Sequence, residues 1–177
     1  SILINDLLRE MNALIDKKSI IIDLELEEMD KVACDNNKIM QVIRNLLSNS
    51  IKFTPDEHKI SIKVISDYIN AFKDKQEKLI PAVRVSIIDQ GVGIPPDELD
   101  KVFDKFVQSS KTKTGAGGTG LGLAICKEII EFHGGSIEAK NNPEQGAEFS
   151  FIIPKKPTKE ELDLLIDKES KKNLLHS

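Results

Sequence analysis

One predicted helix carries three polar residues whose spacing could hold a metal ion and a phosphate. Asn45, Asn49 and Lys52 occupy positions i, i+4 and i+7, which point the same way at about 100° per residue. The opposite face carries core-type residues such as Leu46 and Ile51. Two carboxamides and an ammonium in register can bind a hard cation and a polyanion. Taken alone, such a face is more often simply solvated, so other segments must decide its meaning.

Two glycine-rich segments could bring the backbone close to a ligand. Residues 89–94 (DQGVGI) follow an apolar run typical of a strand, and residues 115–123 (GAGGTGLGL) precede an apolar run typical of a helix. Glycine permits positive φ and a close backbone approach, and the free amides of a helix's first turn attract anions. The second segment therefore suits a phosphate cradle; the alternative is a flexible hinge before a helix.

Two common nucleotide-binding motifs are excluded. Gly115, Gly117 and Gly120 match G-x-G-x-x-G, but the polar residues before them cannot form the buried strand of a dinucleotide fold. Gly115 and Gly120 also have P-loop spacing, yet Leu121 stands where that loop requires Lys. The sequence supports neither fold.

Four motifs in this order closely resemble the N, G1, F and G2 boxes of the ATP-binding catalytic domain of sensor histidine kinases. They are residues 45–53 (NLLSNSIKF), 89–94 (DQGVGI), 103–106 (FDKF) and 118–125 (GTGLGLAI). Residues 146–149 (GAEF) resemble the closing glycine box of the same domain. The broader superfamily includes gyrase, mismatch-repair and chaperone ATPases and the mitochondrial dehydrogenase kinases. The resemblance covers roughly residues 2–154 and implies a Bergerat-type fold.

The resemblance also implies a site for ATP and Mg²⁺. Asp89 would accept a hydrogen bond from the adenine amino group, and Asn49 would bind Mg²⁺ through its amide oxygen, with water and phosphate completing the coordination. Asn45 would support the metal or phosphates, Lys52 would contact phosphate, and Phe53 would pack on the adenine. Further nucleotide contacts are implied for Gly91, Gly93, Ile94, Phe106, Gly118, Thr119, Gly120, Leu121 and Gly122. The segment from about residue 106 to 117 would form the ATP lid.

Position 45 bears on whether the domain is a kinase or a hydrolase. Hydrolytic members of the superfamily usually carry Glu four residues before the metal-binding Asn, as the base that activates water. Asn45 cannot accept a proton at neutral pH, whereas a histidine acceptor is already a nucleophile. We therefore predict slow ATP hydrolysis and transfer of the γ-phosphate to a histidine, with Asn45, Lys52 and Lys105 as catalytic residues. Lys105 would assist the γ-phosphate or dock a partner helix; the alternative is an exposed lysine.

The phosphoacceptor is expected on another domain. None of the three histidines, His58, His133 and His176, lies in the acid-rich helical context of the family's acceptor. The predicted partners are a histidine-bearing dimerisation domain and a response regulator, with a monomeric fragment and a homodimeric full-length protein. Two alternatives stay open: an ATP-driven conformational clamp, which predicts Glu at position 45, and a nucleotide-binding module without phosphotransfer.

Composition limits the other possibilities. The chain has 177 residues, 40% hydrophobic content and a net charge of −4 with both signs interspersed, which suits one domain and no nucleic-acid partner. No apolar run approaches a membrane span, and no signal peptide is visible. Cys34 and Cys126 match no metal spacing. We expect a cytoplasmic location; because the chain starts at Ser1, it could be part of a longer, membrane-anchored protein.

The pattern predicts an α+β fold, a two-layer α/β sandwich with a mixed, mostly antiparallel sheet and helices on one face. Expected elements are helix 2–16, strand 19–27, an extended piece 31–34, a helix capped by Asp35 or Asn36 and ending near Phe53, strands 59–67 and 83–89, a short helix from Pro95, helix 119–132, and strands 136–140 and 147–153. Residues 68–82 are expected to be an exposed loop and residues 108–118 a mobile one. The expected division is a helix and linker at 1–18, the catalytic domain at 19–154 and a charged tail at 155–177.

Overall fold

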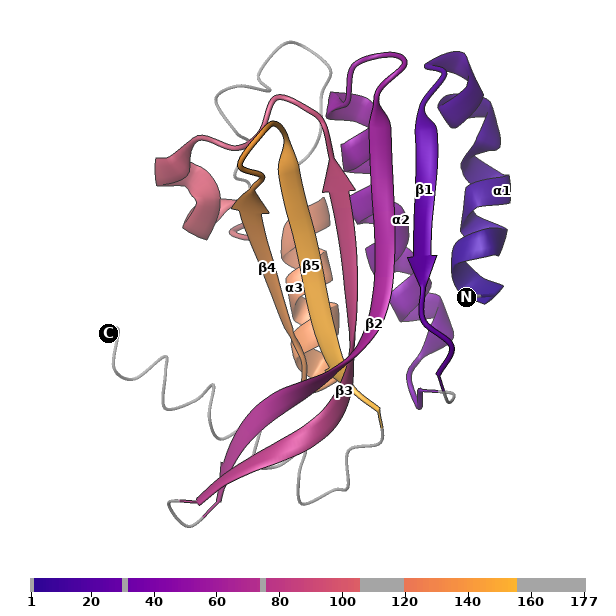
Figure 1. Cartoon of the computed structure of the whole chain (residues 1–177). Coiled ribbons are helices and arrows are strands. Elements are labelled where there is room, and N and C mark those ends of the chain that lie inside the picture. Colours follow the sequence, from indigo (N-terminus) through magenta and orange to yellow (C-terminus); the bar gives the residue numbers. More distant parts are fainter. Residues whose placement is uncertain (1, 30–31, 74–75, 106–119, 156–177) are drawn as a thin grey trace.

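The structure, a computed structural model, describes residues 2–29, 32–73, 76–105 and 120–155, without the side chains of residues 71–73 and 76–78. Its elements are α1 (Ile2–Lys17), β1 (Ile21–Leu26), α2 (Asn36–Phe53), β2 (Lys59–Lys73), β3 (Gln76–Asp89), the 3₁₀ helix η1 (Pro96–Lys101), α3 (Gly122–Phe132), β4 (Ser136–Asn141) and β5 (Ala147–Pro154). The strands form one sheet, and α2 and α3 lie side by side behind it (Figure 1).

The sheet has the strand order β1-β2-β3-β5-β4. β1 and β2 are parallel, and α2 forms the crossover between them; all other neighbours are antiparallel. α1 packs against α2 at the β1 edge (Figure 1) and buries Leu7 and Met11 in the common core. The predicted fold class, a mixed, mostly antiparallel sheet with helices on one face, is confirmed.

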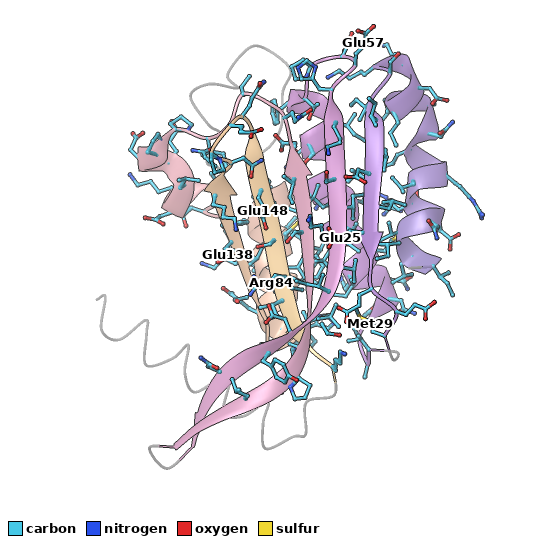
Figure 2. The ribbon with its side chains drawn as sticks, viewed as in Figure 1. Glu25, Met29, Glu57, Arg84, Glu138 and Glu148 are labelled. Atoms are coloured by element: carbon cyan, nitrogen blue, oxygen red, sulfur yellow. The ribbon has the colours of Figure 1, made fainter. Side chains whose placement is uncertain are left out.

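Alternation along the strands separates the two faces of the sheet. Ile60, Ile62 and Ile87 are fully buried and face the apolar side of α2, where Leu46 and Leu47 are also fully buried. The open face is polar. Figure 2 shows Arg84, Glu138 and Glu148 on it. Its ion pairs among the described side chains are Lys59–Asp23, Lys63–Glu25, Arg84–Asp67, Arg84–Glu138 and Lys140–Glu148. The core thus lies between the sheet and the helices.

Local chemistry sets the ends of α2. The Asp35 side chain accepts hydrogen bonds from the backbone amides of Asn37 and Lys38, at 3.0 and 3.2 Å, as a helix N-cap does. The helix ends at Phe53, and Thr54 is extended because the next residue is Pro55. Both predicted ends are confirmed.

The prediction of a loop over residues 68–82 is wrong. β2 and β3 continue as one ladder from the pair Ile60–Asp89 to the pair Lys73–Gln76, and this hairpin extends beyond the other strands (Figure 1). The reason is cross-strand pairing: Ile69 lies directly opposite Ile80, which is only 2% exposed. Polar composition suggested a loop, but the alternating apolar residues within it determine the structure.

Smaller corrections concern element ends. Residues 32–34 form no strand, although the Ala33 amide donates to the Lys155 carbonyl at 3.1 Å. The predicted short helix is the 3₁₀ helix η1, and α3 begins at Gly122, later than the predicted start at residue 119. The segment predicted to be mobile and residues 156–177 lie outside the described part. Within the described part, no helix has the length and apolarity needed to cross a membrane.

Candidate functional site

The site is built where the C-terminal half of α2, the loop after β3 and the start of α3 meet. Asn45 on α2 lies against Gly122, the first residue of α3: a Cβ added to Gly122 would be 3.9 Å from the Asn45 Cγ atom. The Asn45 Nδ2 atom faces the Gly122 carbonyl at 3.5 Å and the Cys126 sulfur at 3.6 Å. Burial raises the pKa of the Cys126 thiol to about 11, so the sulfur is protonated and neutral. The Asn45 amide nitrogen therefore faces α3.

Asp89 is a buried carboxylate at the end of β3 and only 4% exposed. Its Oδ1 atom accepts from the amides of Gly91, at 2.9 Å, and Ala147, at 3.2 Å; its Oδ2 atom accepts from the Ser50 hydroxyl at 3.3 Å. Burial raises the pKa of Asp89, and these three hydrogen bonds oppose that rise. A carboxylate offers about four lone pairs, so the described residues leave Oδ2 one acceptor position for a ligand.

The glycines after Asp89 allow its loop to lie against the end of α2. A Cβ on Gly91 would be 2.8 Å from the Phe53 carbonyl oxygen, closer than real side chains come. Gly93 has a φ of 67°, in the left-handed region that favours glycine. The structure thus brings the first glycine segment and the Asn45–Phe53 helix end together, as the sequence predicts.

The turn between β4 and β5 holds the same loop from the other side. The Asn141 carboxamide accepts from the Ile94 amide at 2.8 Å and donates to the Ile94 carbonyl at 2.6 Å. Asn142 donates to the Asp89 carbonyl at 3.1 Å, and Gln145 to the Gln90 carbonyl at 3.0 Å. These contacts are not predictable from the sequence, because the Asn-Asn-Pro pattern indicates only a turn.

Asn49, Lys52 and Phe53 complete the α2 side. The Asn49 side chain is half-buried and makes no hydrogen bond within the described part of the chain, which leaves its amide oxygen available. The Lys52 ammonium lies 5.1 Å from the centre of the Phe53 ring. The family resemblance implies that Phe53 packs on the adenine and Lys52 contacts a phosphate, and the structure places these two side chains next to each other.

Comparison with known proteins identifies the family of this chain. Residues 34–157 match the family of histidine kinase-, DNA gyrase B- and HSP90-like ATPases. The chain belongs to this family. It is 45% identical over 130 residues to the sensor protein KdpD of Clostridium acetobutylicum, and 36% identical over 131 residues to the sensor histidine kinase WalK of Bacillus subtilis. Each match covers 73% of this chain, but only 13% and 20% of the relative's length.

Solved structures agree with this family assignment. The catalytic domain of histidine kinase ThkA superposes with a TM-score of 0.67 at 33% identity, covering 86% of this chain and 90% of that one. ThkA has also been solved in complex with the response regulator TrrA. The chain is thus an ATP-binding domain of the sensor histidine kinase type, and it corresponds to a small part of its longer relatives.

Of the remaining predicted residues, Lys105 contacts α3, Gly120 and Leu121 directly precede it, and three lie outside the described residues. The Lys105 ammonium forms a 2.8 Å ion pair with Glu128 of α3, and this hydrogen bond raises the pKa of Lys105. Gly120 has a φ of 68° and leads through Leu121 into α3. Phe106, Gly118 and Thr119 lie outside the described residues.

Two of the three histidines have backbone partners. His133, at the end of α3, donates from Nδ1 to the Ile129 carbonyl at 2.7 Å and accepts at Nε2 from the Asp35 amide at 3.2 Å. It therefore bridges the end of α3 and the start of α2. The His58 Nδ1 atom lies 2.8 Å from the Asp56 carbonyl. His176 lies outside the described residues. Both contacts suit structural roles, consistent with an acceptor located elsewhere.

Proposed function

We propose that this chain is the catalytic domain of a two-component sensor kinase, which transfers the γ-phosphate of Mg-ATP to a histidine on a separate dimerisation domain. The observation that carries the proposal is the acceptor position on Asp89 Oδ2 that no described residue fills, in a glycine loop beside the polar face of α2. A buried carboxylate with one acceptor position to spare suits a ligand that presents a single N–H donor, such as the amino group of adenine.

The α2 face and the α3 start would hold the phosphates and the metal. The Asn49 amide oxygen accepts no hydrogen bond from the described residues, and it is the ligand type that Mg²⁺ accepts beside water and phosphate. Lys52 supplies a positive charge on the same face, and the backbone from Gly120 to Gly122 leads into α3, whose first amides would face anions. When bound, Mg²⁺ would neutralise charge on the phosphates. The residues of this chain would orient ATP and prevent it from binding in other orientations.

Asn45 favours phosphotransfer over hydrolysis. Its side chain is an amide whose nitrogen faces the Gly122 carbonyl and Cys126, so it cannot take a proton from water. A neutral imidazole acceptor already has a nucleophilic nitrogen and needs only positioning beside the γ-phosphate. This difference supports a kinase rather than an ATP-driven clamp.

Partners and organisation follow from the same proposal. The intact protein would be a homodimer with a histidine-bearing dimerisation domain and would pass its phosphate to a response regulator. The ThkA complex with TrrA supports the response regulator as a partner. Lys105, now paired with Glu128, would assist the γ-phosphate or dock the partner helix. The proposed division is a helix and linker at residues 1–18, the catalytic domain at 19–154 and a charged tail at 155–177. Helix α1 nevertheless shares the core of the domain through Leu7 and Met11. The location would be cytoplasmic.

The test is to mix this chain with Mg²⁺, γ-labelled ATP and a supplied dimerisation helix pair that carries the acceptor histidine. Acid-labile label on the helix pair is expected, and it should disappear in Asn49→Ala but persist in the control Asn12→Ala, whose carboxamide is exposed on α1. ATP binding with no transfer to any cognate helix pair would favour a nucleotide-binding module without kinase activity. Absence of ATP binding would refute the proposal.

A further inference from the structure

Asn141 makes two short hydrogen bonds to one residue of the loop that carries Asp89. Its carboxamide oxygen accepts from the Ile94 amide at 2.8 Å, and its carboxamide nitrogen donates to the Ile94 carbonyl at 2.6 Å. A primary amide is suited to this pairing because it offers a donor and an acceptor side by side. Ile94 itself is buried, at 7% exposed, so its two backbone groups depend on this partner.

Two glycines lie where the backbone of the loop and the turn around Asn141 come close together. Gly93 has a φ of 67°, and a Cβ there would be 3.0 Å from the Asn141 carboxamide oxygen. Gly146, at the far end of the turn, has a φ of 86°, and a Cβ there would be 2.0 Å from the Asp89 carbonyl oxygen. Both glycines allow the turn and the loop to approach more closely than side chains would permit.

The clamp, by which we mean Asn141, Asn142 and Gln145, holds the loop at both ends. Asn142 and Gln145 bind the carbonyls of Asp89 and Gln90 at its start, and Asn141 binds Ile94 at its end. The clamp directly contacts the backbone of Asp89 but leaves its Oδ2 atom to Ser50 and a ligand. The loop is thereby fixed relative to the carboxylate that would read the base.

We propose that Asn141 is a positioning residue for adenine recognition, acting through the loop from Asp89 to Ile94. The inference rests on the proposed function, because it concerns the same nucleotide. A loop held at Ile94 keeps the base at one distance from Asp89 Oδ2, so that an amino group is accepted there and a carbonyl is rejected. Loosening the loop would lower this discrimination between bases more than it lowers general affinity for a triphosphate.

Inosine triphosphate is the probe, because its base carries a carbonyl oxygen where adenine carries the amino group. Dissociation constants for Mg-ATP and Mg-ITP would be measured by calorimetry on the whole chain, well below the unfolding temperature. The variants are Asn141→Asp, which replaces the donor by an oxygen facing the Ile94 carbonyl, and Asn141→Ala, which removes both bonds. The control is Asn12→Ala, on α1. We expect the Kd ratio of ITP to ATP to fall about tenfold in both variants and to stay unchanged in the control.

The outcomes separate the two proposals. A wild-type chain that binds neither nucleotide overturns the proposed function. A wild-type chain that binds both equally has no discrimination between bases and overturns the positioning role alone. A wild-type chain that prefers ATP, with Asn141 variants that weaken both nucleotides by the same factor, overturns the positioning role and leaves the function standing. Should Asn141→Asp fail to fold, hydrogen exchange of the Ile94 amide decides: faster exchange in Asn141→Ala supports the clamp, and unchanged exchange refutes it.

Discussion

Replacing Asp89 by Asn should reverse the preference of the site between ATP and ITP. Two backbone amides, those of Gly91 and Ala147, point at Oδ1 and will keep an oxygen there, because an NH₂ group cannot accept their hydrogen bonds. The new NH₂ group must then take the place of Oδ2, next to the Ser50 hydroxyl. A donor thus replaces the acceptor that would face the base, so the amino group of adenine is repelled and the carbonyl of hypoxanthine is accepted.

The magnitude follows from one lost hydrogen bond to a charged group. Such a bond contributes about 1.5–3 kcal/mol, so the affinity for ATP should fall roughly 10- to 150-fold while the affinity for ITP rises. The free energy of unfolding of the nucleotide-free protein should rise, in contrast to the affinity for ATP. Because burial raises the pKa of Asp89, the favourable contribution of this group is present below its unfolded pKa and is lost as pH rises through its folded pKa. Asp89→Asn should therefore gain stability relative to wild type as pH rises through that range.

Calorimetric titration with both nucleotides, at neutral pH and with Mg²⁺, measures the preference; urea unfolding at acid and neutral pH measures the stability. The matched control is Asp23→Asn, an exposed aspartate on the open face that contacts Ser61 and Lys59. The control should change neither the ATP preference nor the pH trend. An Asp89→Asn chain that still prefers ATP would show that Oδ2 does not face the base, and the assignment of Asp89 would fail.

Three further predictions concern the supports of the site. Gly146→Ala should lower the free energy of urea unfolding by about 3 kcal/mol or more, since its φ is 86° and its Cβ would lie 2.0 Å from a carbonyl oxygen; Gly122→Ala, whose Cβ would lie 3.9 Å from the nearest described atom, is the control. His133→Ala should lower the free energy of urea unfolding by about 1–2 kcal/mol, because the bridge between α3 and the Asp35 amide is lost. An unchanged value would show that this bridge does not contribute to stability. Asn45→Glu should weaken ATP binding in calorimetry without raising the rate of phosphate release, and a hydrolysis rate well above wild type would contradict this.

Sequence patterns predicted the elements whose ends depend on neighbouring residues. The start of α2 follows from a cap that acts within three positions, and its end follows from Pro55. The hairpin of β2 and β3 was missed because it depends on Ile69 meeting Ile80, a contact that composition cannot show. Sequence patterns predict an element correctly when the interaction that determines it is between residues close in the sequence. Cross-strand pairing is not an interaction of this kind.

The site divides in the same way. The motif residues could be named from their spacing, and the structure places Asn45 against Gly122 and Asp89 against Ser50 of the same helix α2. The residues that hydrogen-bond to Asp89 and its loop could not be named from the sequence. Ser50 is 39 positions from Asp89, and Asn141 is 47 positions from Ile94. Such partners become visible only when the fold places α2 and the β4–β5 turn on opposite sides of one loop.

Asn45 has a structural role in addition to leaving the site without a catalytic base at position 45. Its amide nitrogen faces the Gly122 carbonyl and the Cys126 sulfur, so the side chain also joins α2 to the start of α3. A carboxylate at this position has no donor for that carbonyl, and the neutral thiol, which lies 3.9 Å from the Val42 carbonyl, could offer it only a weak hydrogen bond. Introducing Glu would therefore push α3 away from α2 before it could activate water. In this chain Asn45 contributes to the packing of the two helices as well as to the chemistry, which is why one substitution should not convert this domain into a hydrolase.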